Sequence, residues 1–102
     1  MYLVVFRNRK RTDIVQDQYD AEAARMFELA SQQPGFISFK GYVSDDDEVI
    51  ALSEWESEEA ARAWGKVAEH RVAQANGRSK YYASYTLFGC DNPRVHEFRA
   101  KE

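Results

Sequence analysis

Trp64 and His70 are the side chains of this chain whose types and spacing are best suited to a site. They lie between Trp55 and Gly77, where the apolar residues recur at helical spacing. Tryptophan offers a large apolar ring and one N–H group, and histidine changes its charge near neutral pH. The pair therefore suggests a binding or catalytic site, although core packing for Trp64 and a solvated or capping role for His70 stay open.

Other residues of the same helix extend this candidate site. Val67 lies on the apolar stripe with Trp64, and His70 lies about 120° around the helix from Trp64, at the border of that stripe. Gln74 follows one turn after His70. Arg71 is a cation in the apolar arc, where it could pair with a strand carboxylate such as Glu54 or hold an anionic substrate; we favour the ion pair.

Composition excludes several classes of function. The chain has 102 residues, with 14 basic and 17 acidic side chains and a net charge of −3, so a nucleic-acid partner is not expected. The apolar run 3–6 is too short to span a membrane. The single cysteine, Cys90, cannot form a disulfide within the chain, which favours the cytoplasm. His96 and the cluster 45–47 lack metal-ligand spacing, so no metal site is predicted.

The hydrophobic periodicity predicts one α+β domain over residues 1–102, with a core at 1–90 and a polar tail at 91–102. Strands are expected at 2–8, 36–43, 48–56 and 80–90. One helix should begin at an N-cap on Asp17 and stop at Pro34-Gly35, and a second should begin at Ser57 and stop at Asn76-Gly77. The order β-α-β-β-α-β is that of a ferredoxin-like sandwich, a four-stranded antiparallel sheet with both helices on one face.

The strands are apolar on both faces, which predicts a homodimer. Strict alternation places Phe36 opposite to Phe39, and Tyr82 opposite to Tyr85. A sheet with two apolar faces needs a second covering layer, and a two-fold copy of the same sheet is the simplest one.

Several local patterns resemble the antibiotic biosynthesis monooxygenase superfamily of dimeric α+β barrels. The resemblance covers nearly the full length and rests on Pro34-Gly35-Phe36, Trp55-Glu56-Ser57-Glu58-Glu59-Ala60, Trp64, and Glu69-His70-Arg71-Val72-Ala73-Gln74 before Gly77-Arg78. It implies a ferredoxin-like protomer, a barrel closed by the sheets of two protomers, and a ligand cleft between sheet and helices in each. It also implies that Asn8 faces this cleft on the same side as Val4 and Phe6.

The superfamily includes enzymes that oxygenate aromatic or quinol-like substrates without metal or flavin. Such chemistry needs a base, an apolar pocket and donors for the reduced oxygen. We therefore expect a cofactor-independent monooxygenase of a small electron-rich aromatic or quinol. Asn8 would be the polarising group, Trp64 the wall and His70 the base, with Val4, Phe6, Val67, Arg71 and Gln74 around the substrate. Asn8 could instead cap its strand or turn into the basic run 7–11.

Two alternatives remain open. Haem-degrading members carry their iron-ligating histidine ten residues after the matching tryptophan, where this chain has Gln74. Ligation by His70, one turn earlier, would require a displaced haem. The other alternative is a non-catalytic dimeric protein that binds a small ligand, because a fold does not by itself confer activity.

Overall fold

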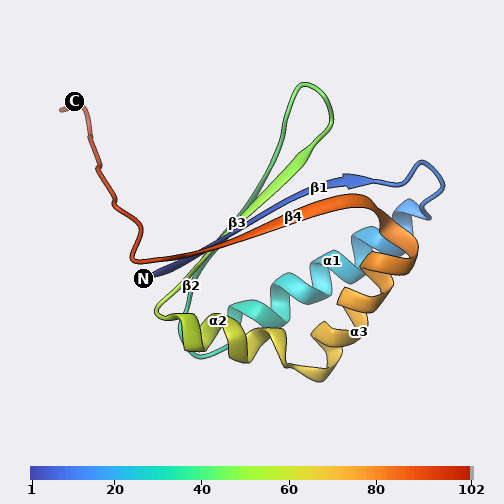
Figure 1. Cartoon of the computed structure of the whole chain (residues 1–102), viewed down its shortest axis with the longest axis horizontal. Coiled ribbons are helices and arrows are strands. Elements are labelled where there is room, and N and C mark those ends of the chain that lie inside the picture. The colour runs from blue at the N-terminus through green and yellow to red at the C-terminus, as the bar shows by residue number, and fades with distance from the viewer. Residues whose placement is uncertain (102) are drawn as a thin grey trace.

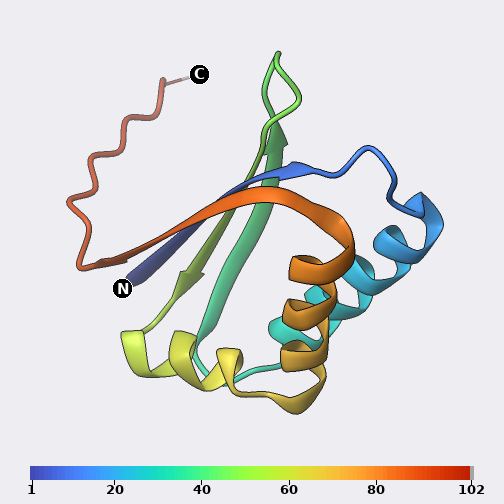
Figure 2. The ribbon, with the colours of Figure 1, turned by 45° about the vertical axis from the view of Figure 1, so that its right-hand side comes forward.

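The computed structural model describes residues 1–101, without the side chains of residues 68 and 69; residue 102 of the predicted tail lies outside this range. The elements follow the order β1 (Tyr2–Lys10), α1 (Gln16–Ser31), β2 (Phe36–Val43), β3 (Val49–Trp55), α2 (Glu58–Gly65), α3 (Ala68–Asn76), the π-helical turn η1 (Gly77–Tyr81) and β4 (Tyr82–Asp91) (Figure 1). The antiparallel sheet has the strand order β2-β3-β1-β4. All helices lie on one side of it (Figure 2), which confirms the α+β ferredoxin-like sandwich.

Helix ends follow local chemistry, with one difference from expectation. Ser57 caps α2 as predicted, because its hydroxyl accepts the Ala60 N–H at 3.1 Å. Gly35, the last residue between α1 and β2, has a φ of 84°, a left-handed conformation that glycine adopts readily. The prediction of Asp17 as an N-cap is wrong: α1 begins at Gln16 with Val15 in the cap position, and Asp17 lies in the first turn, where its charge still suits the helix dipole.

The predicted single helix from Ser57 to Asn76 is two helices. After Gly65, a residue of low helix propensity, Val67 is extended with φ −62° and ψ 130°, and α3 then starts in a new direction. Asn76-Gly77 is not a left-handed stop either, since Gly77 is right-handed and continues into η1. A Cβ at Gly77 would come within 2.7 Å of the Tyr82 ring, so this position needs glycine for close packing.

Two register shifts change which strand residues share a face. In β2 the shift between Phe36 and Ser38 leaves Ile37 without a partner on β3. Phe36 and Phe39 therefore both face α1, where their ring centroids lie 6.5 Å and 5.7 Å from that of Phe27. The predicted alternation of these two residues is wrong, because it ignored the extra residue.

The second shift lies where β1 pairs with β4. Arg9 pairs with Ser84 but Lys10 pairs with Tyr82, which leaves Ala83 as an extra residue. Tyr82 and Tyr85 consequently share the helix side of the sheet, with ring centroids 6.0 Å apart, against the predicted alternation.

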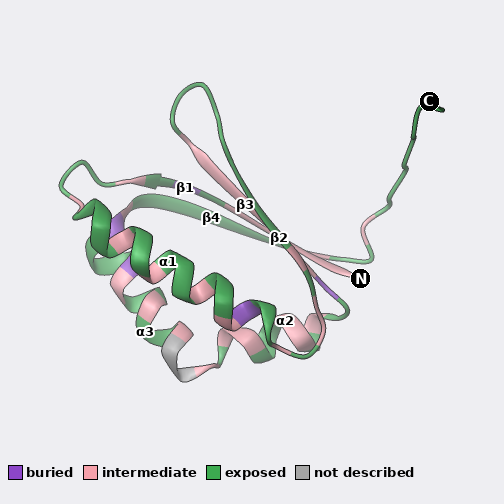
Figure 3. Cartoon of the chain, turned by 180° about the vertical axis from the view of Figure 1, so that it is seen from behind, coloured by how far each residue is buried: buried purple, intermediate pink, exposed green. Residues whose placement is uncertain are grey.

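The face of the sheet away from the helices is uncovered and carries apolar side chains between polar ones. The pairing places Val5 beside Leu52 and Phe88 on this outer face, with Tyr42 further along it beside Ile50. Phe88 is 43% exposed and Tyr42 48%, and Figure 3 shows few fully buried segments anywhere. After β4 the chain runs away from the body as an extended tail (Figure 1). In residues 1–101 no helix is long and apolar enough to cross a membrane.

Candidate functional site

A stack of three aromatic rings joins the sheet to the helices. The ring centroids of Trp55, at the end of β3, and Trp64, on α2, lie 6.5 Å apart at 24°. His70, near the start of α3, stacks on the other side at 4.1 Å and 13°. On a continuous helix Trp64 and His70 would point in different directions. The break after Gly65 brings their rings into contact, so the structure places these two predicted site residues together.

One hydrogen bond fixes the orientation of His70. Its Nδ1 lies 3.0 Å from the backbone oxygen of Trp64, which the helix break leaves without its usual partner. A carbonyl oxygen only accepts, so Nδ1 carries the proton and Nε2 keeps its lone pair. The histidine thus caps α2, one of the roles left open by the sequence. Burial lowers the pKa of His70, partly opposed by this hydrogen bond, so the ring is neutral at pH 7 and Nε2 can accept a proton.

Asn8 lies inside β1, two residues before its end, rather than at a turn. It is 3% exposed and faces the helices, with Val4 and Phe6 on the same side as predicted. Its Oδ1 accepts a hydrogen bond from Nζ of Lys10. The strand-capping alternative is therefore excluded, and the amide is a buried polar group on the helix side of the sheet.

Tyrosines from α1 and β4 surround Lys10. Its ammonium nitrogen lies 4.8 Å from the ring centroid of Tyr19 and 5.1 Å from that of Tyr82. The ring centroid of Phe6 lies 5.3 Å from those of both Tyr82 and Tyr85. This cluster could not be predicted from the sequence, because Lys10 belongs to a basic run typical of a solvated surface. The register shift that turns Tyr82 inward also has no glycine or proline to mark it.

A half-buried acid ties α1 to α3 and η1. The Glu22 carboxylate accepts hydrogen bonds from the Tyr81 hydroxyl at 2.7 Å and from the Asn76 side-chain amide at 3.2 Å. The hydrogen bond to the carboxylate, with burial, raises the pKa of Tyr81 to about 12. Burial is the main cause that raises the pKa of Tyr82. Both phenols are therefore neutral at physiological pH. These residues lie 54 and 59 positions from Glu22, and no local pattern links them.

Arg71 and Gln74 are not drawn into the site. Both are exposed on α3, and Glu54 accepts a hydrogen bond of 2.7 Å from the Ser38 hydroxyl instead of an ion pair from Arg71. The prediction that Arg71 points into an apolar arc is wrong, because α3 is a separate helix from α2. Val67 is half-buried at the junction of the two helices.

The basic run 7–11 at the end of β1 does not form a clamp for a carboxylate ligand. Its arginines are committed to acids of this chain: Arg7 to Glu48 at 3.2 Å, Arg9 to Asp46 at 2.6 Å, and Arg11 to Asp13 at 3.0 Å. Among the side chains that the structure describes, no three His, Cys, Asp or Glu residues gather where they could hold a metal ion.

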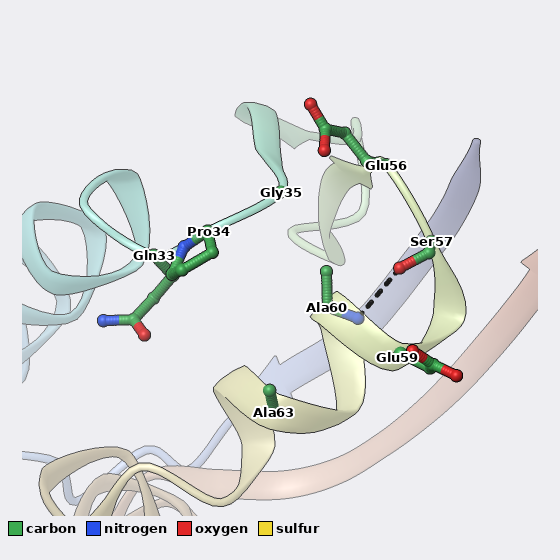
Figure 4. A pocket seen from close by; sticks show the side chains of 8 residues that line it. All are labelled: Gln33, Pro34, Gly35, Glu56, Ser57, Glu59, Ala60 and Ala63. Carbon is green, nitrogen blue, oxygen red and sulfur yellow. Dashed lines mark hydrogen bonds between the residues drawn. The ribbon is translucent and has the colours of Figure 1, made fainter.

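Two surface hollows border other parts of the molecule. The larger, about 330 Å³, lies between the end of α1 and the start of α2, with Ala60 and Ala63 along its wall (Figure 4). The other, about 230 Å³, lies beside Ile14 and Tyr81. Neither is lined by Asn8, Trp64 or His70.

Comparison with known proteins gives both a family and a fold. Residues 1–76 match the sequence model of the antibiotic biosynthesis monooxygenase family. The uncharacterized protein YqjZ of Bacillus subtilis is 35% identical over 86 residues, which cover 84% of this chain and 74% of that protein. Rv0793 from Mycobacterium tuberculosis superposes with a TM-score of 0.79 at 15% identity, over 94% of this chain and 98% of that one. SnoaB, a cofactor-independent oxygenase from Streptomyces nogalater, superposes with a TM-score of 0.67 at 18% identity, over 95% and 100%. The two structural likenesses show the fold.

The lowered pKa of His70 predicts a pH-dependent stability. The unfolded chain takes up a proton near pH 6.5 and the folded chain only at lower pH, so the free energy of unfolding should fall as pH drops below 6.5. His70→Phe keeps a ring against Trp64 and should remove this component. Urea unfolding at pH 7.5 and 5.5 measures it, with His96→Phe in the exposed tail as control. The same pH dependence in His70→Phe and wild type would contradict the assignment.

Proposed function

Because this chain belongs to the antibiotic biosynthesis monooxygenase family, we propose that it is a cofactor-independent monooxygenase of a small electron-rich aromatic or quinol. The observation that carries this proposal is the state of His70, a neutral imidazole clamped against Trp64 with Nε2 able to accept a proton. The likeness to SnoaB, described as a cofactor-independent oxygenase, supports the same reaction class.

The reaction asks little of the protein beyond proton transfer and charge stabilisation. Removal of a substrate proton by Nε2 of His70 would give an electron-rich anion that can pass an electron to O2. One oxygen atom then joins a substrate carbon that loses two hydrogens, and the other leaves as water, so the substrate supplies all four electrons. The Asn8 amide would stabilise the anionic oxygen, and Trp64 would exclude water from one side.

We place the substrate between the sheet and the helices. Asn8, Val4 and Phe6 line the sheet side, and Trp64 and His70 belong to the helix layer. Val67 lies beside them at the junction of α2 and α3. Arg71 and Gln74 are exposed, so we assign them no part in the chemical step.

The residues fit a haem group poorly. Gln74, at the position of the iron ligand in the haem-degrading relatives, is exposed, and an amide is a weak iron ligand. Trp64 covers one face of the His70 ring, and the His70 Nδ1 is already engaged by the Trp64 carbonyl. We therefore derive no step through haem.

We also propose that two copies pair through the outer face of the sheet. The row Val5, Leu52 and Phe88 is apolar, belongs to the central and edge strands, and has no cover from the helices. A second copy would bury this face by two-fold symmetry. The free Cys90 fits a reducing compartment, and we propose the cytoplasm as the place where the protein works.

Oxygen uptake with candidate quinols, in protein freed of metal, tests the reaction. His70→Ala should lower kcat by about 10² to 10⁴-fold, because it removes the base. Asn8→Ala should cost on the order of 10²-fold, the usual effect of losing one oxyanion donor. Trp64→Phe keeps the wall and should cost less. His96→Ala is the control, and turnover should decline as pH falls through the pKa of His70. Full activity in both His70→Ala and Asn8→Ala would show that the site is elsewhere.

Light scattering coupled to size exclusion tests the pairing. The unmodified chain should run at twice its 11.8 kDa mass at micromolar concentration. Phe88→Glu should raise the dimer dissociation constant by about 10² to 10³-fold, because it buries an unpaired charge. Leu87→Glu is the matched control, since Leu87 is the adjacent residue on the opposite face and is 60% exposed. A folded wild-type monomer under these conditions would refute the barrel.

A further inference from the structure

Lys10 differs from the three arginines of the basic run. Arg7, Arg9 and Arg11 pair with carboxylates, whereas Lys10 forms no ion pair with the residues that the structure describes. Its side chain is on the helix side of the sheet, half-buried between the rings of Tyr19 and Tyr82. A cation held away from bulk water without a counter-ion leaves charge available for a ligand.

The Asn8 amide presents donors to the same place. Lys10 binds Oδ1 of Asn8, which leaves the two N–H groups of Nδ2 as the open end of the amide. No described residue accepts from Nδ2. Because no fully buried side-chain polar atom of the described residues lacks a partner, Nδ2 must reach accessible space even though Asn8 as a whole is 3% exposed. The Asn8 amide and the Lys10 ammonium thus both carry donors on the helix side of the sheet.

The rings that surround Lys10 are flat and uncharged. Phe6, Tyr82 and Tyr85 form an aromatic wall beside Lys10. Tyr82 stays protonated because burial and its neighbour Tyr19 raise its pKa. The carboxylate that acts on Tyr82, Glu22, is engaged by Tyr81 and Asn76, so both of its oxygens are already bound.

We propose that Asn8 and Lys10 form a subsite for the anionic oxygen of a planar aromatic ligand, a phenolate or an enolate, with its ring against Phe6, Tyr82 and Tyr85. This deepens the proposed function and rests on it only for the place of the substrate. Nζ of Lys10 supplies the charge and Nδ2 of Asn8 a directed hydrogen bond. Lys10 also fixes the Asn8 amide with its donors outward, so it acts on the substrate both directly and through Asn8.

Such a subsite should bind the ionised form of a phenol in preference to the neutral form. A cation in partly buried surroundings stabilises a nearby negative charge more than it would in water. The phenol pKa of a bound ligand should therefore be lower than that of the same compound free in solution. The protein would in this way bring the substrate to the anion that reacts with O2.

The probe is 4-nitrophenol, whose phenolate absorbs in the visible, and nitrobenzene is its uncharged counterpart. Absorbance titration should show that wild-type protein binds 4-nitrophenolate at least tenfold more tightly than nitrobenzene and lowers the phenol pKa of the bound probe. Lys10→Met should weaken phenolate binding about 10- to 100-fold and leave nitrobenzene binding unchanged. Lys10→Arg, which restores a cation, should recover part of this loss. Lys66→Met removes the same charge from an exposed lysine and is the control.

Equal wild-type affinity for 4-nitrophenolate and nitrobenzene overturns the proposal without any variant, so the test holds even if Lys10→Met fails to fold. Equal losses in Lys10→Met and Lys66→Met overturn it as well. Binding requires no turnover, so the two proposals fail separately. A preference for the phenolate without oxygen uptake would support the subsite and refute the oxygenase. Oxygen uptake without this preference would support the oxygenase and refute the subsite.

Discussion

The ring of Trp55 is the contact on which the arrangement of sheet and helices depends. It is 1% exposed, the least of the large side chains that the structure describes. Phe36 of β2 meets it edge-on at 5.5 Å, Trp64 of α2 lies on it at 6.5 Å, and its indole N–H donates to the Ser53 hydroxyl at 3.2 Å. A buried tryptophan with a satisfied N–H is strongly favourable, so α2 is held in one place over the end of the sheet. Trp64 in turn fixes the position of His70, because the two rings stack on each other.

The helix break after Gly65 makes the Trp64 carbonyl available to the His70 side chain. In a continuous helix the carbonyl of Trp64 would accept a backbone N–H four residues later. Here it accepts the Val67 N–H at 3.1 Å and the His70 Nδ1–H at 3.0 Å. The Trp64 carbonyl is therefore satisfied at the end of α2, and it requires the His70 tautomer that has its proton on Nδ1. At the far end of α3, η1 and Tyr81 close over Glu22, and the Tyr82 ring packs on Gly77 beside Lys10. Trp64 and His70 therefore both stabilise the end of α2 and form the candidate site.

Much of the fold could be predicted from the sequence because periodicity is local. The strands, the cap at Ser57 and the left-handed Gly35 each follow from a few neighbouring residues. The register shifts at Ile37 and Ala83 could not be predicted, since neither has a glycine or proline to mark it, and each reverses the faces of the residues beyond it. The low helix propensity of Gly65 indicated a possible helix break. The apolar stripe continues across this residue, however, and favoured a single helix. For the site, Trp64 and His70 were found by residue type. The inward turn of Lys10 and the Glu22 to Tyr81 hydrogen bond depend on packing between distant elements.

We propose that His70 is held as a neutral base whose Nε2 carries no proton, and nitrogen-15 NMR of the imidazole measures this state. At pH 7 we expect a proton on Nδ1 and an unprotonated Nε2, the tautomer that the Trp64 carbonyl requires. The Trp64→Phe variant keeps this carbonyl and should give the same tautomer. A proton on Nε2 alone, or a ring protonated on both nitrogens at that pH, would contradict the account and remove His70 as the base.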